Sequence, residues 1–188
     1  DTAFRNVTDF EQYTVKRKAV WFVSNIKFNV KKHGLKGFSD EILKIIEGCE
    51  IAIKLPEYGV ATSTVEKHLV ENGVEVIPSF VSSARVVVET EKIISSSFSG
   101  VAALARYYKK ECIIVKNTHP NDFQLQQNIF NDYVALLGNP IIIENNTHMK
   151  AALGKSTKYR TNSHRCGVFR DDFIDEYYQE LFNAQHPI

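Results

Sequence analysis

Short apolar runs alternate along this chain with stretches whose apolar residues recur at helical spacing. The apolar runs have the length and branched side chains typical of buried strands, and they are residues 18–24, 50–54, 74–77, 92–95, 111–115 and 141–143. Strands that alternate with helices in this way form a parallel sheet with right-handed crossovers. We therefore predict an α/β fold: a Rossmann-like three-layer domain with a mainly parallel sheet and helices on both faces.

Capping residues place the first helices. Ser39 is expected to cap a helix that follows a polar loop containing Gly34 and Gly37. The next helix is expected to start at Thr62 or Ser63. The sequence thus predicts a strand, a loop and a helix in each of the first two units.

Later helices are predicted from periodicity, over residues 99–109 and 121–137. Residues 82–91 are ambiguous. The topology requires a crossover helix there, whereas the run of valines at 86–88 favours a strand.

The length of 188 residues fits one domain with one core. We predict a single Rossmann-like domain over residues 1–188. It has an N-terminal extension at 1–17, a loop-rich excursion at 145–170 and a C-terminal helix with an apolar stripe at 171–184. Because the chain starts at Asp1 and not at methionine, it is expected to be processed or to be part of a larger protein.

Charge and composition exclude several classes of partner. Lys and Arg number 23 against 22 Asp and Glu, so the net charge of +1 provides no general attraction for nucleic acid. No apolar run reaches the roughly 18–20 residues that a membrane span needs. The 3 cysteines are too few for a disulfide scaffold and fit a reducing compartment, so a soluble, cytoplasmic protein is expected.

No cofactor or metal is expected from the motifs. The pair His164 and Cys166 has atoms that bind zinc, but a zinc site needs further ligands. The sequence has no glycine-rich dinucleotide fingerprint, Walker loop or nucleophile elbow.

The sharpest candidate site is a serine-rich turn between the predicted fourth strand and the helix at 99–109. In open parallel sheets, ligands bind beyond the carboxyl ends of the strands. Small residues at a helix start expose backbone N–H groups, and the helix dipole favours an anion there. The turn thus predicts a phosphate site, and its residues are Ser95, Ser96, Ser97, Ser99 and Gly100. The alternative is that Ser97 or Ser99 only caps the helix.

Polar residues at neighbouring strand ends extend this candidate site. Lys116 and His119 follow the fifth strand and are candidates for contacting a phosphate; His119 is also the only candidate proton donor. Alternatively, His119 begins a turn that caps the next helix. Lys54 ends the second strand and is a further phosphate candidate, with a solvated turn as its alternative. No other catalytic residue is assigned.

The stretch 91–105, followed by 110–115, resembles the C-terminal, donor-binding half of GT-B glycosyltransferases, and bacterial sialyltransferases in particular. In that superfamily, a strand ends in a serine pair that holds the phosphate of the donor. The resemblance implies that Ser96, Ser97 and Ser99 lie at the donor phosphate.

Two functional hypotheses follow. The first is a sugar-nucleotide-binding domain of a glycosyltransferase, which binds a nucleotide sugar or another phosphorylated small molecule and needs a second domain or subunit to complete transfer. The second is a non-catalytic Rossmann-like module that binds a small anion or a protein partner.

Overall fold

The computed structural model describes residues 14–56, 59–116, 118–119 and 127–154. The chain divides into two units, Asp1–Lys155 and Ser156–Ile188, and every described residue belongs to the first. The predicted single domain and the predicted C-terminal helix at 171–184 therefore stay predictions. Most of the expected N-terminal extension also lies outside the described residues, but its last residue, Arg17, is the first residue of a strand.

Strands and helices alternate throughout the described part of the chain. They are β1 (Arg17–Phe22), α2 (Ile26–Ile46), β2 (Ala52–Lys54), α3 (Gly59–Glu71), β3 (Val76–Ile77), α4 (Ser83–Val88), β4 (Thr90–Ser96), α5 (Gly100–Tyr107), β5 (Glu111–Val115), α6 (Gln127–Leu136), β6 (Ile141–Ile143) and α7 (Asn146–Gly154). None of these helices is both long enough and apolar enough to cross a bilayer.

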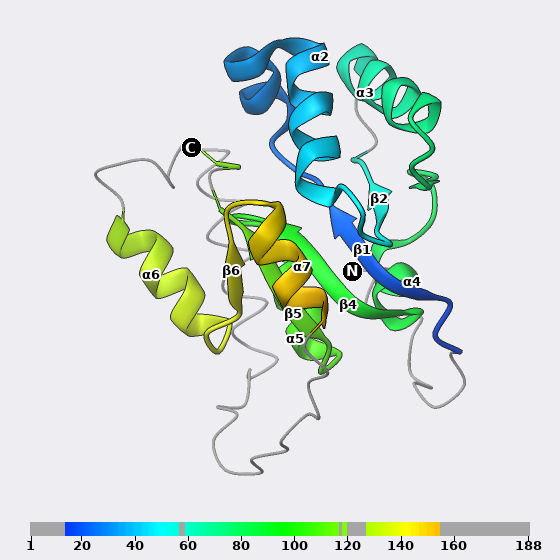
Figure 1. The fold of residues 1–188 in the computed structure, drawn as a ribbon. Helices are drawn as coiled ribbons and strands as arrows, with labels where there is room; N and C mark the ends of the chain where they lie inside the picture. The colour runs from blue at the N-terminus through cyan, green and yellow to red at the C-terminus, as the bar shows by residue number, and fades with distance from the viewer. Residues whose placement is uncertain (1–13, 57–58, 117, 120–126, 155–188) are drawn as a thin grey trace, which may run out of the picture. The chain divides into compact units, whose positions relative to one another are not determined.

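The strands form a six-stranded sheet in the order β3-β2-β1-β4-β5-β6, and every neighbouring pair is parallel. The chain moves outward from β1 to β3, returns to β4 on the other side of β1 and then moves outward again to β6 (Figure 1). This order is that of a doubly wound sheet. The predicted α/β, Rossmann-like fold is confirmed.

Helices cover both faces of the sheet because neighbouring strand residues point to opposite sides. On one face, Trp21 of β1 packs in a cluster with Ile42 of α2, Leu69 of α3 and Met149 of α7. On the other face, Val20 of the same strand packs with residues of α4 and α5, and a smaller cluster joins α5 to α6. The molecule therefore has the three layers that the sequence predicts.

The first helix begins earlier than predicted. α2 starts at Ile26, soon after β1, and the polar stretch expected to be a loop is helical on both sides of a kink at Gly34. Gly34 has φ +74°, a conformation that glycine adopts readily, so the helix can bend there and continue. Ser39 is buried inside the helix, and its hydroxyl donates to the carbonyl of Leu35 at 3.1 Å instead of capping a helix start.

The ambiguous segment at 82–91 contains a helix followed by the start of a strand. α4 spans Ser83–Val88 and β4 begins at Thr90. The three valines are buried against the sheet, and Thr90 donates from its hydroxyl to the carbonyl of Val86 at 2.6 Å. Tertiary burial at the crossover position therefore outweighs the β propensity of valine.

The loop-rich excursion predicted over 145–170 is wrong for its first part, because α7 occupies Asn146–Gly154. Asn145 caps this helix by accepting, through Oδ1, a hydrogen bond from the His148 N–H at 3.0 Å. Asn146 donates to the carbonyls of Ile45 and Glu47, both at 2.9 Å, and so ties α7 to the end of α2. Residues 155–170 lie outside the described residues.

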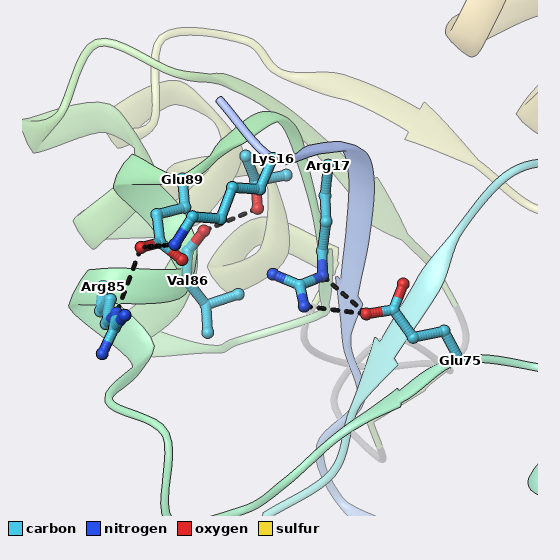
Figure 2. A network of polar contacts seen from close by, with 7 residues as sticks. Lys16, Arg17, Glu75, Arg85, Val86 and Glu89 are labelled. Carbon is cyan, nitrogen blue, oxygen red and sulfur yellow. Dashed lines mark hydrogen bonds and ion pairs between the residues drawn. The ribbon is translucent and has the colours of Figure 1, made fainter. Parts of the chain in front are cut away.

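A network of charges secures the start of β1 at the amino edge of the sheet. The carboxylate of Glu89 lies between Lys16 and Arg85, at 2.7 and 3.1 Å, and only 7% of its side chain is exposed (Figure 2). Burial by itself raises the pKa of the Glu89 carboxyl, but the hydrogen bonds and charges of Lys16 and Arg85 outweigh burial and hold that pKa below its ordinary value. The ionised form of Glu89 is therefore stabilised by folding.

We expect Glu89→Gln to lower the free energy of unfolding by about 1–2 kcal/mol at pH 7, because it removes charge-assisted hydrogen bonds. A carboxyl with a lowered folded pKa stabilises above its unfolded pKa, and that contribution is lost as pH falls through the folded pKa. The gap between wild type and variant should therefore close under acid, in urea unfolding across a pH series.

Glu75→Gln is the matched control for this prediction. Glu75 pairs with Arg17 at 2.8 Å in the same region, but 56% of its side chain is exposed (Figure 2). Its loss should cost no more than about 0.5 kcal/mol. An equal deficit of Glu89→Gln at pH 7 and at acid pH would contradict the assignment.

Candidate functional site

The carboxyl ends of β1 and β4 lie side by side at the point where the sheet reverses its strand order. Phe22 of β1 is in register with Ser95 of β4. The chain leaves β1 for α2 on one face and leaves β4 for α5 on the other face. In doubly wound sheets, this switch point is where loops diverge and ligands bind.

The serines that end β4 connect the strand ends with their own polar groups. Ser95, Ser96 and Ser97 are 0% exposed. The Ser95 hydroxyl donates to the Ser96 carbonyl at 2.9 Å, and the Ser97 hydroxyl donates to the Val115 carbonyl at 2.9 Å. The Ser96 hydroxyl accepts from the Ser24 N–H at 3.1 Å. These three hydroxyls therefore stabilise the edge of the sheet, and their predicted contact with a phosphate stays a prediction.

Ser99 caps α5, as the alternative interpretation of the turn expected. Its hydroxyl accepts a hydrogen bond from the Val101 N–H at 3.3 Å. The Ser99 N–H donates to the hydroxyl of Tyr133 at 3.2 Å. Gly100, the first residue of α5, is exposed, and its N–H has no partner among the described residues. One helix-start donor at the switch point is therefore available to a ligand.

Two residues at this edge have a left-handed backbone that side chains other than glycine rarely adopt. Asn25, before α2, has φ 56°, and Phe98, before α5, has φ 54°. The ring of Phe98 stacks on Tyr133 at 5.0 Å and lies 4.9 Å from the ring of His119. Asparagine adopts this conformation more readily than most residues, whereas for a bulky residue such as Phe98 it costs about 1–3 kcal/mol, and such residues concentrate at functional sites.

Of the other predicted site residues, two lie at the same edge of the sheet as this turn and one does not. Lys116 follows β5 at the same edge, where its Nζ forms an ion pair with Glu144 at 3.3 Å. His119 is brought to the turn by its contact with Phe98. Lys54 is not brought there, because β1 separates it from β4. Its Nζ is buried and donates to the carbonyls of Pro78 and Ser79, at 3.2 and 3.1 Å, instead of facing solvent.

Thr118 and Asn29 are buried polar residues of the edge that the sequence did not single out. Thr118 Oγ1 accepts from the Ser97 N–H at 2.8 Å and donates to the Val115 carbonyl at 2.9 Å. Asn29 donates to the carbonyls of Asn25 and Thr118, at 3.0 and 3.2 Å. Periodicity offers a weak signal for Asn29, which falls on the inner face of α2. We call the following set of residues the switch-point site: Ser24, Asn25, the turn at 95–100, Lys116 and Thr118.

A cavity of about 200 Å³ opens at this edge on the α2 face of the sheet. Its apolar lining includes Trp21 and Val115, and its polar lining comes from strand ends and from α2. The polar lining residues are Ser24, Asn29, Lys32, His33, Glu41, Ser96, Lys116, Thr118 and Glu144. We call it the α2-side cavity. Trp21 is 2% exposed, and its indole N–H has no hydrogen-bond partner among the described residues.

A larger hollow of about 730 Å³ lies at the opposite, amino edge of the sheet. It is lined by the start of β1, including Arg17, and by the end of α2, including Glu47. Helices present their negative C-terminal ends at this edge, which disfavours anions. Position therefore favours the smaller α2-side cavity as the ligand site, despite its size.

The described residues contain no group of three or more His, Cys, Asp or Glu side chains that could hold a metal ion. The predicted weak pair, His164 and Cys166, lies outside the described residues. The electrostatics of the switch-point site come from the Lys116–Glu144 ion pair and from the positive end of the α5 dipole.

Comparison with known proteins shows a distant structural likeness. No protein-family model matches the sequence, and no curated protein matches it. The structure of E. coli heptosyltransferase WaaC with ADP-2-deoxy-2-fluoro heptose is similar over 67% of this chain and 46% of that chain, with 21% sequence identity and a TM-score of 0.39. This chain thus spans less than half the length of that glycosyltransferase.

The strand order and the edge at which the polar residues gather define this chain by class, as a doubly wound, Rossmann-like α/β domain. The sialyltransferase-like part of the sequence resemblance stays a prediction.

Proposed function

We propose that this chain binds a phosphorylated small molecule at the switch-point site, and that the ligand is a nucleotide sugar used in glycosyl transfer. One observation carries the proposal. A helix start with an unused N–H, two left-handed residues and a polar cavity all coincide with the point where the strand order reverses. That point is where open α/β sheets bind nucleotides.

The phosphate is assigned to the start of α5. There the Gly100 N–H is available, and the positive end of the helix dipole stabilises negative charge. The hydroxyls of Ser95, Ser96 and Ser97 hold the backbone of the turn in place through their own hydrogen bonds, and the main phosphate contact is proposed to be the Gly100 N–H. Lys116 and His119 flank the turn and are proposed to contact the phosphate, whereas Lys54 is proposed to have a structural role.

Transfer of a sugar needs more than this site. The sequence resemblance to the donor-binding half of GT-B glycosyltransferases supports a nucleotide sugar as the ligand class. In such an enzyme, the acceptor and the general base come from a second domain or subunit. His119 is the candidate proton donor within this chain.

The test is thermal denaturation with a panel of ADP, UDP, GDP and CMP and of ADP-glucose, UDP-glucose, GDP-mannose and CMP-sialic acid. A specific ligand at 100 times its Kd stabilises the fold by about 2.7 kcal/mol. For a domain of this size, that corresponds to a rise in Tm of about 5–10 °C. If no member of the panel raises Tm, the proposal is wrong.

The alternative function is binding without catalysis. It is favoured because the hydroxyls of Ser95 and Ser97 already bond to backbone carbonyls and Lys116 already pairs with Glu144. Groups bonded within the protein in this way are less suited to a catalytic role. A nucleotide sugar that binds and is neither hydrolysed nor transferred, even with the complete protein and an acceptor present, would support it.

A further inference from the structure

We propose that the α2-side cavity is a subsite for a single neutral sugar ring, so that the sugar of the nucleotide sugar enters the domain beside β1. This inference rests on the proposed function and names where the sugar lies. It differs from the phosphate site, which lies at the start of α5 on the other face of the sheet.

The indole of Trp21 is the first argument. Its N–H is buried without a partner among the described residues, and such a group costs about 1–3 kcal/mol. Trp21 otherwise packs among apolar side chains such as Phe38 and Ile42. Trp21 also lines the α2-side cavity. A ligand hydroxyl oxygen that enters beside the ring supplies the acceptor that this N–H lacks.

The balance of charge in the lining is the second argument. The lining contains the cations Lys32 and Lys116 and the carboxylates Glu41 and Glu144, so it has no net charge when His33 is neutral. A phosphate or carboxylate placed here would meet two carboxylates as well as two cations and would gain no net attraction. Sugar hydroxyls both donate and accept, and they match a lining that offers both kinds of group.

Asn29 adds an acceptor to the lining. Its amide nitrogen donates to two backbone carbonyls, at 3.0 and 3.2 Å, so its two hydrogens are used. What the side chain offers a ligand is Oδ1. The residues of the lining thus include one with an unused N–H donor on β1 and one with an amide acceptor on α2, which suits neighbouring hydroxyls on one ring.

The size of the cavity and its connection to the edge set which part of the ligand it takes. A volume of about 200 Å³ is below the roughly 300–1,000 Å³ of sites that hold a whole drug-sized ligand. One ring fits, and a nucleoside stays outside. Ser96 and Thr118 line the cavity, and Thr118 bonds to the Ser97 N–H, so the cavity opens at the edge assigned to the phosphate.

Trp21 is the only tryptophan of the chain, so its emission reports directly on this cavity. The experiment titrates the protein with each nucleotide and its sugar ester, UDP against UDP-glucose and ADP against ADP-glucose among them, while following fluorescence and calorimetry. We expect the sugar ester that binds to change Trp21 emission and to bind more tightly than its nucleotide, whereas the nucleotide alone leaves the emission nearly unchanged.

Two variants separate the sugar from the phosphate. Trp21→Phe should weaken binding of the sugar ester by about three- to tenfold, as expected for one neutral hydrogen bond, and leave the nucleotide unaffected. Glu41→Ala acts at an exposed residue of the lining on α2, apart from the Lys116–Glu144 pair, and should do the same without disturbing the core. Glu71→Ala is the matched control, because it breaks the exposed pair with Lys67 on α3, away from the cavity.

The outcomes are distinct. If a nucleotide and its sugar ester bind with equal Kd and neither changes Trp21 emission, the subsite proposal is wrong and the proposed function stands. If both variants weaken the nucleotide and its sugar ester alike, the subsite is also wrong. If no nucleotide or sugar ester binds at all, the proposed function fails and the subsite fails with it.

Discussion

Lys92→Met is expected to lower the free energy of unfolding by about 3–5 kcal/mol, as for other buried ion pairs that lose one partner. Lys92 lies on β4 with 3% of its side chain exposed, and its Nζ lies 3.3 Å from the carboxylate of Glu111. The same Nζ donates to the carbonyls of Ala152 and Leu153, at 3.0 and 3.3 Å, at the end of α7. The substitution therefore removes the compensating charge of a buried carboxylate and the donor that caps a helix C-terminus.

Urea unfolding of a double-mutant cycle measures this effect. Adding Glu111→Gln to Lys92→Met removes the uncompensated charge, so the double variant should recover at least about 1 kcal/mol relative to Lys92→Met. Lys67→Met is the control, because the Lys67–Glu71 pair is exposed on α3 and 3.8 Å apart; its loss should change stability by less than about 0.5 kcal/mol. Additive losses from Lys92→Met and Glu111→Gln would contradict the pairing.

The strands could be predicted from the sequence because their signal is local. β5 has the predicted bounds of Glu111–Val115, and β6 those of Ile141–Ile143. The first and last helices of the described part, α2 and α7, were harder to predict because their causes are tertiary. The polar sequence at the start of α2 predicts a loop, because the packing of its inner face against the sheet cannot be seen in the local pattern. The start of α7 depends on Asn146, whose amide bonds to carbonyls about a hundred positions earlier in the chain.

The location of the site could be predicted from the sequence, but the hydrogen-bond partner of each hydroxyl could not. A serine-rich turn after a central strand is enough to predict the switch point. Which hydroxyls face a ligand depends on the neighbouring strand ends: Ser96 meets the Ser24 N–H and Ser97 meets the Val115 carbonyl. These partners are distant in sequence, so the turn by itself gives no sign that its hydroxyls are occupied. Trp21 was missed as a polar group because tryptophan within an apolar strand reads only as core.

Gly100→Pro is expected to weaken phosphate-dependent binding by about tenfold to a hundredfold while the fold stays intact. Proline lacks an N–H, so the substitution removes the one donor of the α5 start that has no partner among the described residues. A hydrogen bond to a charged group contributes about 1.5–3 kcal/mol, which corresponds to that range of Kd. The effect should appear in calorimetry with a nucleotide that binds wild type.

The backbone at this position accepts proline. The first position of a helix is where proline is most readily tolerated, since no helical hydrogen bond is lost. The preceding residue, Ser99, has φ −108° and ψ 133°, an extended conformation compatible with a following proline. Gly100→Ala is the matched control: it adds a side chain but keeps the N–H, so it should bind like wild type. If Gly100→Ala loses affinity as much as Gly100→Pro does, the cause is steric and the N–H is not the phosphate donor. If Gly100→Pro binds like wild type with an unchanged Tm, the phosphate does not lie at the start of α5.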